Sequence, residues 1–312
     1  MIDVVDLSPW TLGGSDFLRD RSAVALDDAL RSHGLVFVTG HGIPASVIAG
    51  VTDASRRFFA EPDDVKRALV PPVAGERGYV PPYAEMMCRS LGIDAPSGRF
   101  DPFEAFDVGT SATDYPRVRT ADATFSPNRW PALPDFRRDV DLFFDEVGRV
   151  ARTVMAALAA VLGRGATGFE PITDRSVDIL RLAHYGTVDD PLVDGMSAHQ
   201  DFGLLSVSHA TGPGLQIAVD RRWVDAEAPD GALPVFVGET LARLSGERWL
   251  PTLHRVRPAA ERYSAIYYHE GNADAPLAPG ETIGAHISRK AAAVHPGGSA
   301  YWDAAALARL PR

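Results

Sequence analysis

The sequence predicts a helical N-terminal half packed against an antiparallel β core, either a sandwich or a jelly roll. Two observations indicate this class. Residues 1–165 carry mainly helical periodicity, whereas residues 176–294 contain short β-like runs separated by Gly, Pro and Asp turns. No change in composition marks a flexible linker in the 312 residues. We therefore expect residues 1–312 to form a single domain, mainly β with α.

The first elements follow from local patterns. Residues 16–32 place apolar side chains among charges and stop before Gly34, which predicts an amphipathic helix. Residues 35–39 (LVFVT) have the composition of a buried strand. A turn follows, and residues 45–59 are expected to form a second helix.

The middle of the chain changes character twice. Residues 70–129 are rich in Pro, Gly and aromatics, with weak periodicity, which predicts a long irregular connection that serves as a lid or substrate loop. Residues 134–162 repeat apolar residues every three or four positions and predict the longest helix, ended by Gly163. Short strands are then expected at 177–183, 204–208, 214–219, 233–237 and 262–268.

Charge and cysteine content exclude several classes. The chain has 31 basic and 41 acidic side chains, a net charge of −10, so nucleic acid and anionic membranes are not expected partners. With Cys88 as the single cysteine, a metal site must use His and carboxylate ligands. The N-terminal residues carry acids where a secretory signal carries bases, and no run of about 18 apolar residues occurs. We expect a cytoplasmic protein.

Two histidines and an aspartate have the spacing of a metal site. His199 and Asp201 are two residues apart, so in a strand both side chains would face the same side. Such a triplet arises easily by chance and decides nothing alone. His254 follows 53 residues after Asp201 in another β-like segment, and two His plus one carboxylate form the ligand set of non-haem Fe(II) oxygenases. Arg262 and Ser264, again two apart, are suited to hold a carboxylate.

The chain resembles, nearly end to end, the Fe(II)- and 2-oxoglutarate-dependent dioxygenases of the isopenicillin N synthase-like group. The resemblance lies in an ordered series of short phrases rather than in any single one. These are residues 2–7 (IDVVDL), 34–44 (GLVFVTGHGIP), 57–59 with 65–67, 78–80, 103–107 (FEAFD), 128–131 (NRWP), 199–201, 214–216, 223–224, 238–240, 254–256 (HRV) and 262–264 (RYS).

This resemblance implies a double-stranded β-helix (jelly roll) core over residues 176–294, with Fe(II) held by His199, Asp201 and His254. It implies that 2-oxoglutarate chelates the iron through its keto acid end and that Arg262 and Ser264 bind its other carboxylate. O2 would be the second cosubstrate. The intact Asp201 argues against a halogenase, in which a small residue stands at this position.

Tyr185 corresponds to a family tyrosine that helps bind the carboxylate of 2-oxoglutarate. Its alternative role is packing in the core. The family asparagine two positions earlier is Ala183 here, a departure that removes one contact and weakens the assignment of Tyr185.

The implied reaction oxidises a small molecule, an amino acid or a natural-product intermediate, by hydroxylation, desaturation or cyclisation, while 2-oxoglutarate is converted to succinate and CO2. Three alternatives remain: an oxidase of the same fold that does not use 2-oxoglutarate, an ethylene-forming-like enzyme acting with arginine, and a non-catalytic binding protein. We expect a monomer or weak homodimer.

Substrate contacts are expected from the 70–129 segment and from residues near the metal and the last strand. Glu85 would either pair with a cationic substrate or be solvated on its loop, and Phe202 would either line the pocket or belong to the core. The expected contacts are Tyr79, Glu85, Arg89, Phe202 and Tyr268.

Overall fold

The computed structural model describes residues 2–73, 76–111, 126–190 and 192–295. Its strands are β1 (Val4–Asp6), β2 (Leu35–Thr39), β3 (Gly78–Val80), β4 (Glu104–Gly109), β5 (Ile179–Tyr185), β6 (Met196–His199), β7 (Leu205–Ala210), β8 (Leu215–Val219), β9 (Arg222–Asp225), β10 (Leu233–Val237), β11 (His254–Val256), β12 (Arg262–His269), β13 (Pro276–Ala278) and β14 (Glu281–Thr282). Its helices are α1 (Ser8–Thr11), α2 (Asp16–His33), α3 (Ala45–Phe59), α4 (Asp63–Arg67), the short 3-10 helix η1 (Met87–Leu91), α5 (Phe136–Val161), α6 (Glu170–Thr173), α7 (Glu239–Leu244) and α8 (Ile283–Val294).

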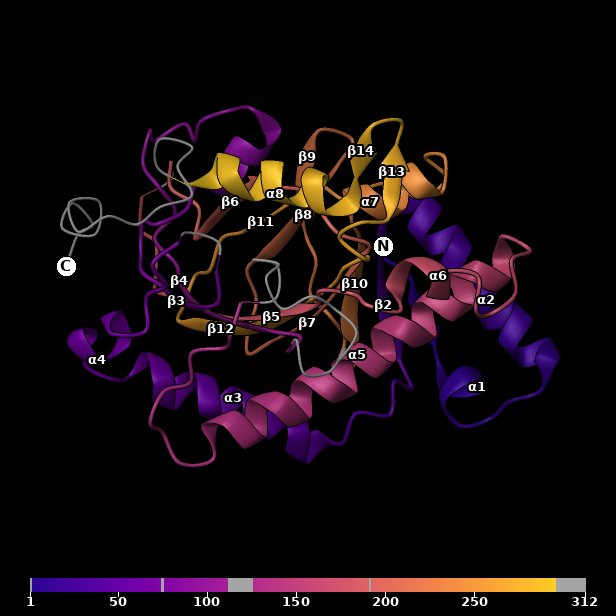
Figure 1. The fold of residues 1–312 in the computed structure, drawn as a ribbon, viewed down its shortest axis with the longest axis horizontal. Coiled ribbons are helices and arrows are strands. Elements are labelled where there is room, and N and C mark those ends of the chain that lie inside the picture. Colours follow the sequence, from indigo (N-terminus) through magenta and orange to yellow (C-terminus); the bar gives the residue numbers. More distant parts are fainter. Residues whose placement is uncertain (1, 74–75, 112–125, 191, 296–312) are drawn as a thin grey trace.

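Two sheets form the β core. The larger has eight strands in the order β1-β2-β10-β7-β12-β5-β4-β3, and the smaller has four in the order β6-β11-β8-β9. The pair β1–β2 is parallel, and the other pairs in both sheets are antiparallel. This arrangement is the predicted jelly-roll core with an N-terminal helical part (Figure 1).

The expected helices are present with nearly the expected bounds. The predicted helix at 45–59 is α3, that at 16–32 is α2, and that at 134–162 is α5. Gly34 ends α2 in the left-handed conformation at φ +65°, which a side chain would strain.

The prediction for residues 70–129 was wrong in part. The segment contains β3, η1 and β4, and β4 pairs with β5 while β3 forms the edge of the larger sheet. These strands are short and flanked by Pro and Gly, so their pairing with a distant strand leaves little local signal. Residues 74–75 and 112–125 of the expected lid lie outside the described residues.

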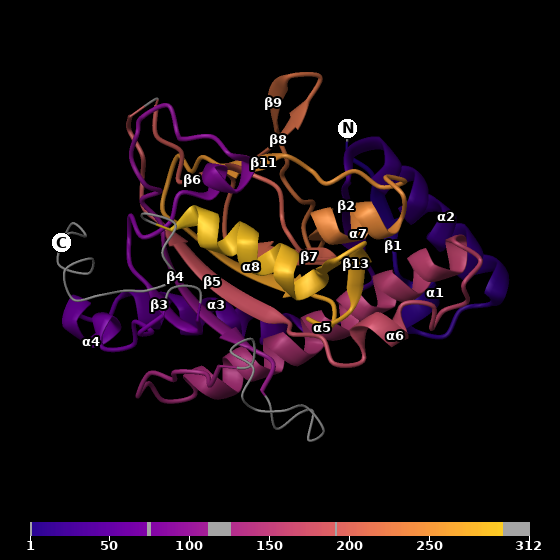
Figure 2. The same ribbon diagram turned by 45° about the horizontal axis from the view of Figure 1, so that its top comes forward.

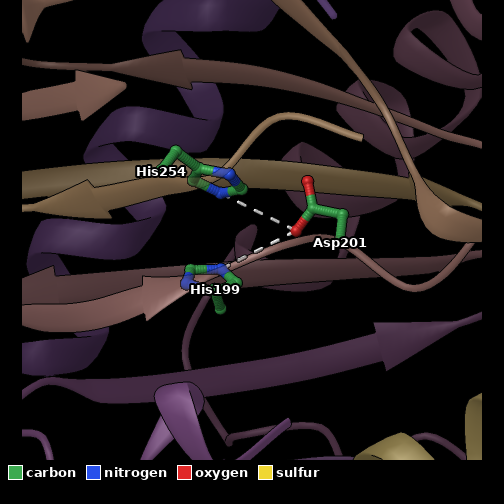
Figure 3. Close-up of side chains that lie close together, drawn as sticks. All are labelled: His199, Asp201 and His254. Atoms are coloured by element: carbon green, nitrogen blue, oxygen red, sulfur yellow. Dashed lines mark ion pairs between the residues drawn. The ribbon is translucent and has the colours of Figure 1, made fainter. Parts of the chain in front are cut away.

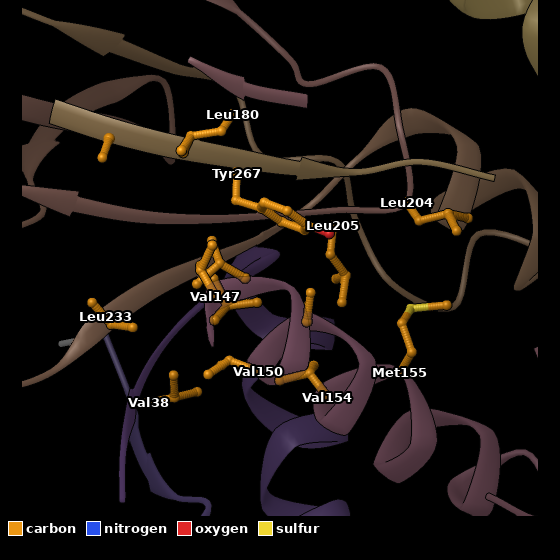
Figure 4. Packing of buried hydrophobic residues seen from close by; sticks show 14 of the residues in the cluster. Val38, Val147, Val150, Val154, Met155, Leu180, Leu204, Leu205, Leu233 and Tyr267 are labelled. Atoms are coloured by element: carbon orange, nitrogen blue, oxygen red, sulfur yellow. The ribbon is translucent and has the colours of Figure 1, made fainter. Parts of the chain in front are cut away.

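The main hydrophobic core lies between the larger sheet and the helical layer. On α5, Val147, Val150 and Val154 are fully buried, and they pack with residues of β2, β5, β7, β10 and β12 (Figure 4). The helices α2 and α3 pack beside α5. Burying this apolar stripe is what makes the long amphipathic helix stable.

The opposite side of the larger sheet faces the smaller sheet. Figure 2 shows α8 and α5 on opposite sides of the larger sheet, and α8 contacts η1 and β14. A cavity between the two sheets is lined from one side by β5, β7, β10 and β12 and from the other by β6, β8 and β11. In the described residues, no helix is long and apolar enough to cross a membrane.

Candidate metal centre

Three buried side chains converge in the cavity between the sheets. His199 is the last residue of β6, His254 is the first residue of β11, and the two stand opposite each other in the antiparallel pair. Nε2 of His199 lies 3.7 Å and Nε2 of His254 lies 3.8 Å from Oδ1 of Asp201 (Figure 3). Asp201 lies beyond the end of β6, so the irregular segment after the strand, and not a shared strand face, brings it to the histidines.

Both histidines present the same nitrogen to the centre. Nδ1 of His199 lies 2.8 Å from the carbonyl oxygen of Ser197, and Nδ1 of His254 lies 2.9 Å from that of Thr252. A carbonyl only accepts, so each Nδ1 carries the hydrogen and each Nε2 keeps its lone pair for a metal. Burial and the neighbouring His254 lower the pKa of His199 to about 4, which keeps this ring neutral at pH 7.

The donor set suits a divalent iron site. The three ligand atoms all lie within 4.8 Å of one another, and in the described residues this is the one such group of His, Cys, Asp or Glu. Two imidazoles and one carboxylate on one side of an ion leave its other positions open, the arrangement of non-haem Fe(II) oxygenases.

Two unpartnered donors lie in the same cavity. Arg262 and Ser264 on β12 are both buried, and Nε of Arg262 donates to the carbonyl oxygen of Gly212 at 3.1 Å. Nη1 of Arg262 and Oγ of Ser264 are buried without a hydrogen-bond partner. Because such groups are costly to leave unsatisfied, they indicate an absent acceptor, and a carboxylate matches both.

Tyr185 stands opposite Arg262 in the pairing of β5 with β12, with the guanidinium 5.2 Å from its ring centre. Burial raises the pKa of Tyr185, against the opposing effects of Arg262 and Ser264. The tyrosine therefore lines the cavity and also packs in its wall.

A second cavity of about 120 Å³ adjoins the first and shares Asp201 and Tyr268 with it. Of the expected substrate contacts, Glu85, Phe202 and Tyr268 line it. Its remaining wall combines apolar side chains of η1, β5 and α8 with the ionisable side chains of Asp107, Arg181, Glu270 and His295.

Tyr79 and Arg89 do not line this cavity, contrary to expectation. Tyr79 is buried in the main core, where its hydroxyl donates to Glu104. Arg89 pairs with Asp94 at 2.8 Å and lies over the ring of Phe100. Both lie in the predicted loop, but β3 and η1 direct their side chains elsewhere.

Glu85 is not solvated on its loop, which was one of the two environments expected for it. It is 4% exposed and accepts two hydrogen bonds from Arg181, at 2.8 and 3.1 Å. Arg181 also donates to both oxygens of Asp107, at 2.9 and 2.7 Å. Sequence reasoning missed this group because the pairs join residues 96 and 74 positions apart, and no local pattern reports such a pairing.

Glu270 is the other residue that the sequence did not single out. It lines the second cavity, and its Oε2 is buried without a hydrogen-bond partner. Burial, with the nearby Asp178 and Asp201, raises the pKa of Glu270 to about 8. The weak available signal was its position directly after the strand that carries Arg262.

Two family models match the chain in sequence order. Residues 2–133 match the non-haem dioxygenase in morphine synthesis N-terminal model, and residues 176–270, which include the triad, match the 2OG-Fe(II) oxygenase superfamily model. The chain belongs to the Fe(II)- and 2-oxoglutarate-dependent dioxygenases of the isopenicillin N synthase-like group.

Similar proteins extend over most of this dioxygenase. It is 29% identical to "2-oxoglutarate-Fe(II) type oxidoreductase hxnY" of Emericella nidulans, over 87% of this chain and 80% of that protein. It is 27% identical to "Homoarginine-6-hydroxylase 2-ODD-C23.2" of Arabidopsis thaliana, over 89% and 80%. The crystal structure of a full-length Neurospora crassa protein in complex with alpha-KG and thymine superposes with a TM-score of 0.78 at 25% identity, covering 94% of this chain and 96% of that one.

The dioxygenase is therefore an oxidoreductase that uses Fe(II), 2-oxoglutarate and O2 to oxidise a small molecule. The described structure contains a triad that could hold a metal ion and, in the same cavity, two buried donors without partners.

Proposed function

We propose that His199, Asp201 and His254 ligate Fe(II), and that Arg262 and Ser264 bind the distal carboxylate of 2-oxoglutarate. The observation that carries this assignment is the presence, in one cavity, of the triad and of two buried donors without partners. The triad would accept a metal and the two donors would accept an anion, as a ligand with a chelating end and a distal carboxylate requires.

Bound Fe(II) supplies the activation of O2 that couples conversion of 2-oxoglutarate to succinate and CO2 with oxidation of the substrate. The chain's own residues orient the metal ligands and hold the cosubstrate. The Ser197 and Thr252 carbonyls hold the two imidazoles in the ligating tautomer. Arg262, whose guanidinium lies over the ring of Tyr185 and whose Nε is anchored on Gly212, holds the distal carboxylate at a buried position.

The second cavity is the proposed substrate site. It adjoins the metal centre through Asp201 and Tyr268, and Phe202 contributes an aromatic wall next to the ligand. The relatives support an amino acid or a natural-product intermediate as substrate, since one is named a homoarginine hydroxylase and another is a "Validamycin A dioxygenase" of Streptomyces hygroscopicus, 28% identical over 89% of this chain.

We propose further that the chain acts as a single domain and as a cytoplasmic monomer or weak homodimer. In the larger sheet, strands of the first family-model region lie on both sides of strands of the second, with β2 beside β10 and β4 beside β5, which supports one folding unit. One cooperative unfolding transition would test the single domain, and the mass of the particle in light scattering would test the oligomeric state.

An anaerobic titration tests the assignment of the cofactor site. Adding Fe(II) and 2-oxoglutarate should produce the absorption band of the metal chelate, and a screen of amino acids should then find compounds that accelerate succinate release. A protein that binds Fe(II) but forms no chelate, and that consumes O2 with substrate alone, would instead be an oxidase of the same fold. A protein that binds no Fe(II) would refute the metal centre.

A further inference from the structure

The second cavity carries an excess of negative charge. Arg181 has five N–H donors, and four of them are used in the hydrogen bonds to Glu85 and Asp107. With two carboxylates and one guanidinium, the three side chains together carry a net charge of −1. Because all three are buried, water screens this charge poorly. Arg181 thus has no pair of free donors with which to receive a substrate carboxylate.

Glu270 adds a carboxyl group whose position is fixed. Its backbone N–H donates to Oδ1 of Asp178 at 2.8 Å, and Asp178 is itself held by the hydroxyl of Tyr267 at 2.6 Å. The Glu270 carboxyl packs against the backbone of Gly203, where a Cβ atom would overlap it. The free Oε2 therefore results from a defined packing arrangement and not from a loose surface side chain.

An unpartnered oxygen in a buried wall needs a hydrogen-bond partner. Because its pKa is about 8, the Glu270 carboxyl is largely protonated at pH 7 without a bound cation, and a cation beside Oε2 would favour the ionised form. The Glu85–Asp107–Arg181 group lines the same cavity and Asp178 lies near Glu270, and their negative charge opposes any further negative charge. His295, after α8, also lines the cavity. The apolar side chains of η1 and α8 complete the walls and suit a hydrocarbon portion.

Resting on the proposed function, we propose that this dioxygenase acts on a substrate with a positively charged nitrogen, an ammonium or guanidinium group on an apolar chain. Glu270 is the residue that receives this group, and the Glu85–Asp107–Arg181 group supplies the negative field that rejects substrate anions. A neutral donor would satisfy Oε2 but would gain nothing from the net charge of the wall.

A series of probes of similar size separates charge from shape. We would titrate n-butylammonium, n-butylguanidinium, 1-pentanol and pentanoate into the anaerobic protein loaded with Fe(II) and 2-oxoglutarate, and follow the chelate band and the Tm. The cations should bind about tenfold or more tightly than 1-pentanol, and pentanoate should bind least. Equal affinities, preference for pentanoate, or no binding by either cation would overturn the proposal.

Glu270→Gln tests the residue itself, because it keeps the size of the side chain and removes its ability to become a carboxylate beside a cation. The variant should lose about tenfold in affinity for the cations and little for 1-pentanol. Glu247→Gln, at an exposed glutamate, is the matched control and should change neither. If Glu270→Gln fails to fold, Glu270→Asp, which shortens the reach, should still weaken the cations selectively; unchanged cation affinity in the folded variant would refute the role.

The chelate band distinguishes failure of the cofactor assignment from failure of the proposed substrate class. If Fe(II) and 2-oxoglutarate form no chelate in the wild type, the proposed function fails. If the chelate forms and the cations show no preference, the cofactor assignment stands and the substrate class fails.

Discussion

Replacing Arg262 tests the cosubstrate site most directly. In the structure its guanidinium performs two tasks: Nε is anchored on the carbonyl of Gly212, and Nη1 points into the cavity without a partner. In Arg262→Ala the distal carboxylate of 2-oxoglutarate would be buried with no opposite charge, a loss that costs about 2–5 kcal/mol. At 1.4 kcal/mol for each factor of ten, the affinity for 2-oxoglutarate should fall about 30- to 4,000-fold.

Three further variants divide this effect into its parts. Arg262→Lys keeps the charge but cannot both reach the carboxylate and bond Gly212, so an intermediate loss is expected. Ser264→Ala removes one neutral donor, worth about 0.5–1.5 kcal/mol, or roughly 2- to 12-fold. Arg222→Ala, at an exposed arginine of β9, is the control and should leave the affinity unchanged.

The assay is the anaerobic chelate titration, with the Tm of each variant as the check on folding. The expected order of 2-oxoglutarate dissociation constants runs from wild type and Arg222→Ala, through Ser264→Ala and Arg262→Lys, to Arg262→Ala. A folded Arg262→Ala protein that binds 2-oxoglutarate as tightly as the wild type would refute the assignment of this arginine.

Three other changes have defined outcomes. Asp201→Ala should abolish Fe(II) retention and succinate formation with the far-UV circular dichroism intact, and activity that survives would show the metal assignment to be wrong. Asp27→Asn should lower the free energy of unfolding by about 1–3 kcal/mol. Although burial opposes them, hydrogen bonds from Arg248 and Trp249 lower the pKa of Asp27, so its contribution is complete above the unfolded-state pKa of about 3.9 and is lost as the pH falls through the folded-state value. Denaturant titrations should therefore show the wild-type advantage shrinking below pH 4, and a constant difference would contradict the account. Gly34→Ala should destabilise by about 1–3 kcal/mol, because φ is +65° and Cβ would overlap the Leu250 carbonyl; an unchanged Tm would contradict this reasoning.

The sequence by itself determined the long helices α2, α3 and α5 and the core strands β2, β5, β7, β8, β10 and β12. The bounds of α2, α3 and α5 agree with the predicted ranges within about two residues, because the spacing of apolar residues and the terminating glycines act over a few positions. The position of Arg262 and Ser264 on the same face of one strand was also predictable, since alternation along a strand is a local property. Predicting the proposed metal triad also required the position of His254 and the phrases that the chain shares with the family.

The tertiary structure decided everything that depends on which strands are neighbours. It assigned β3 and β4 to the larger sheet, placed Tyr79 in the core, and brought Arg181 between Glu85 and Asp107. It also left Oε2 of Glu270 unpartnered in a cavity that Asp201 lines as well. Local patterns do not predict these contacts. Alternation along a strand predicts which face a side chain occupies, whereas the register with a distant strand determines which residues that side chain contacts.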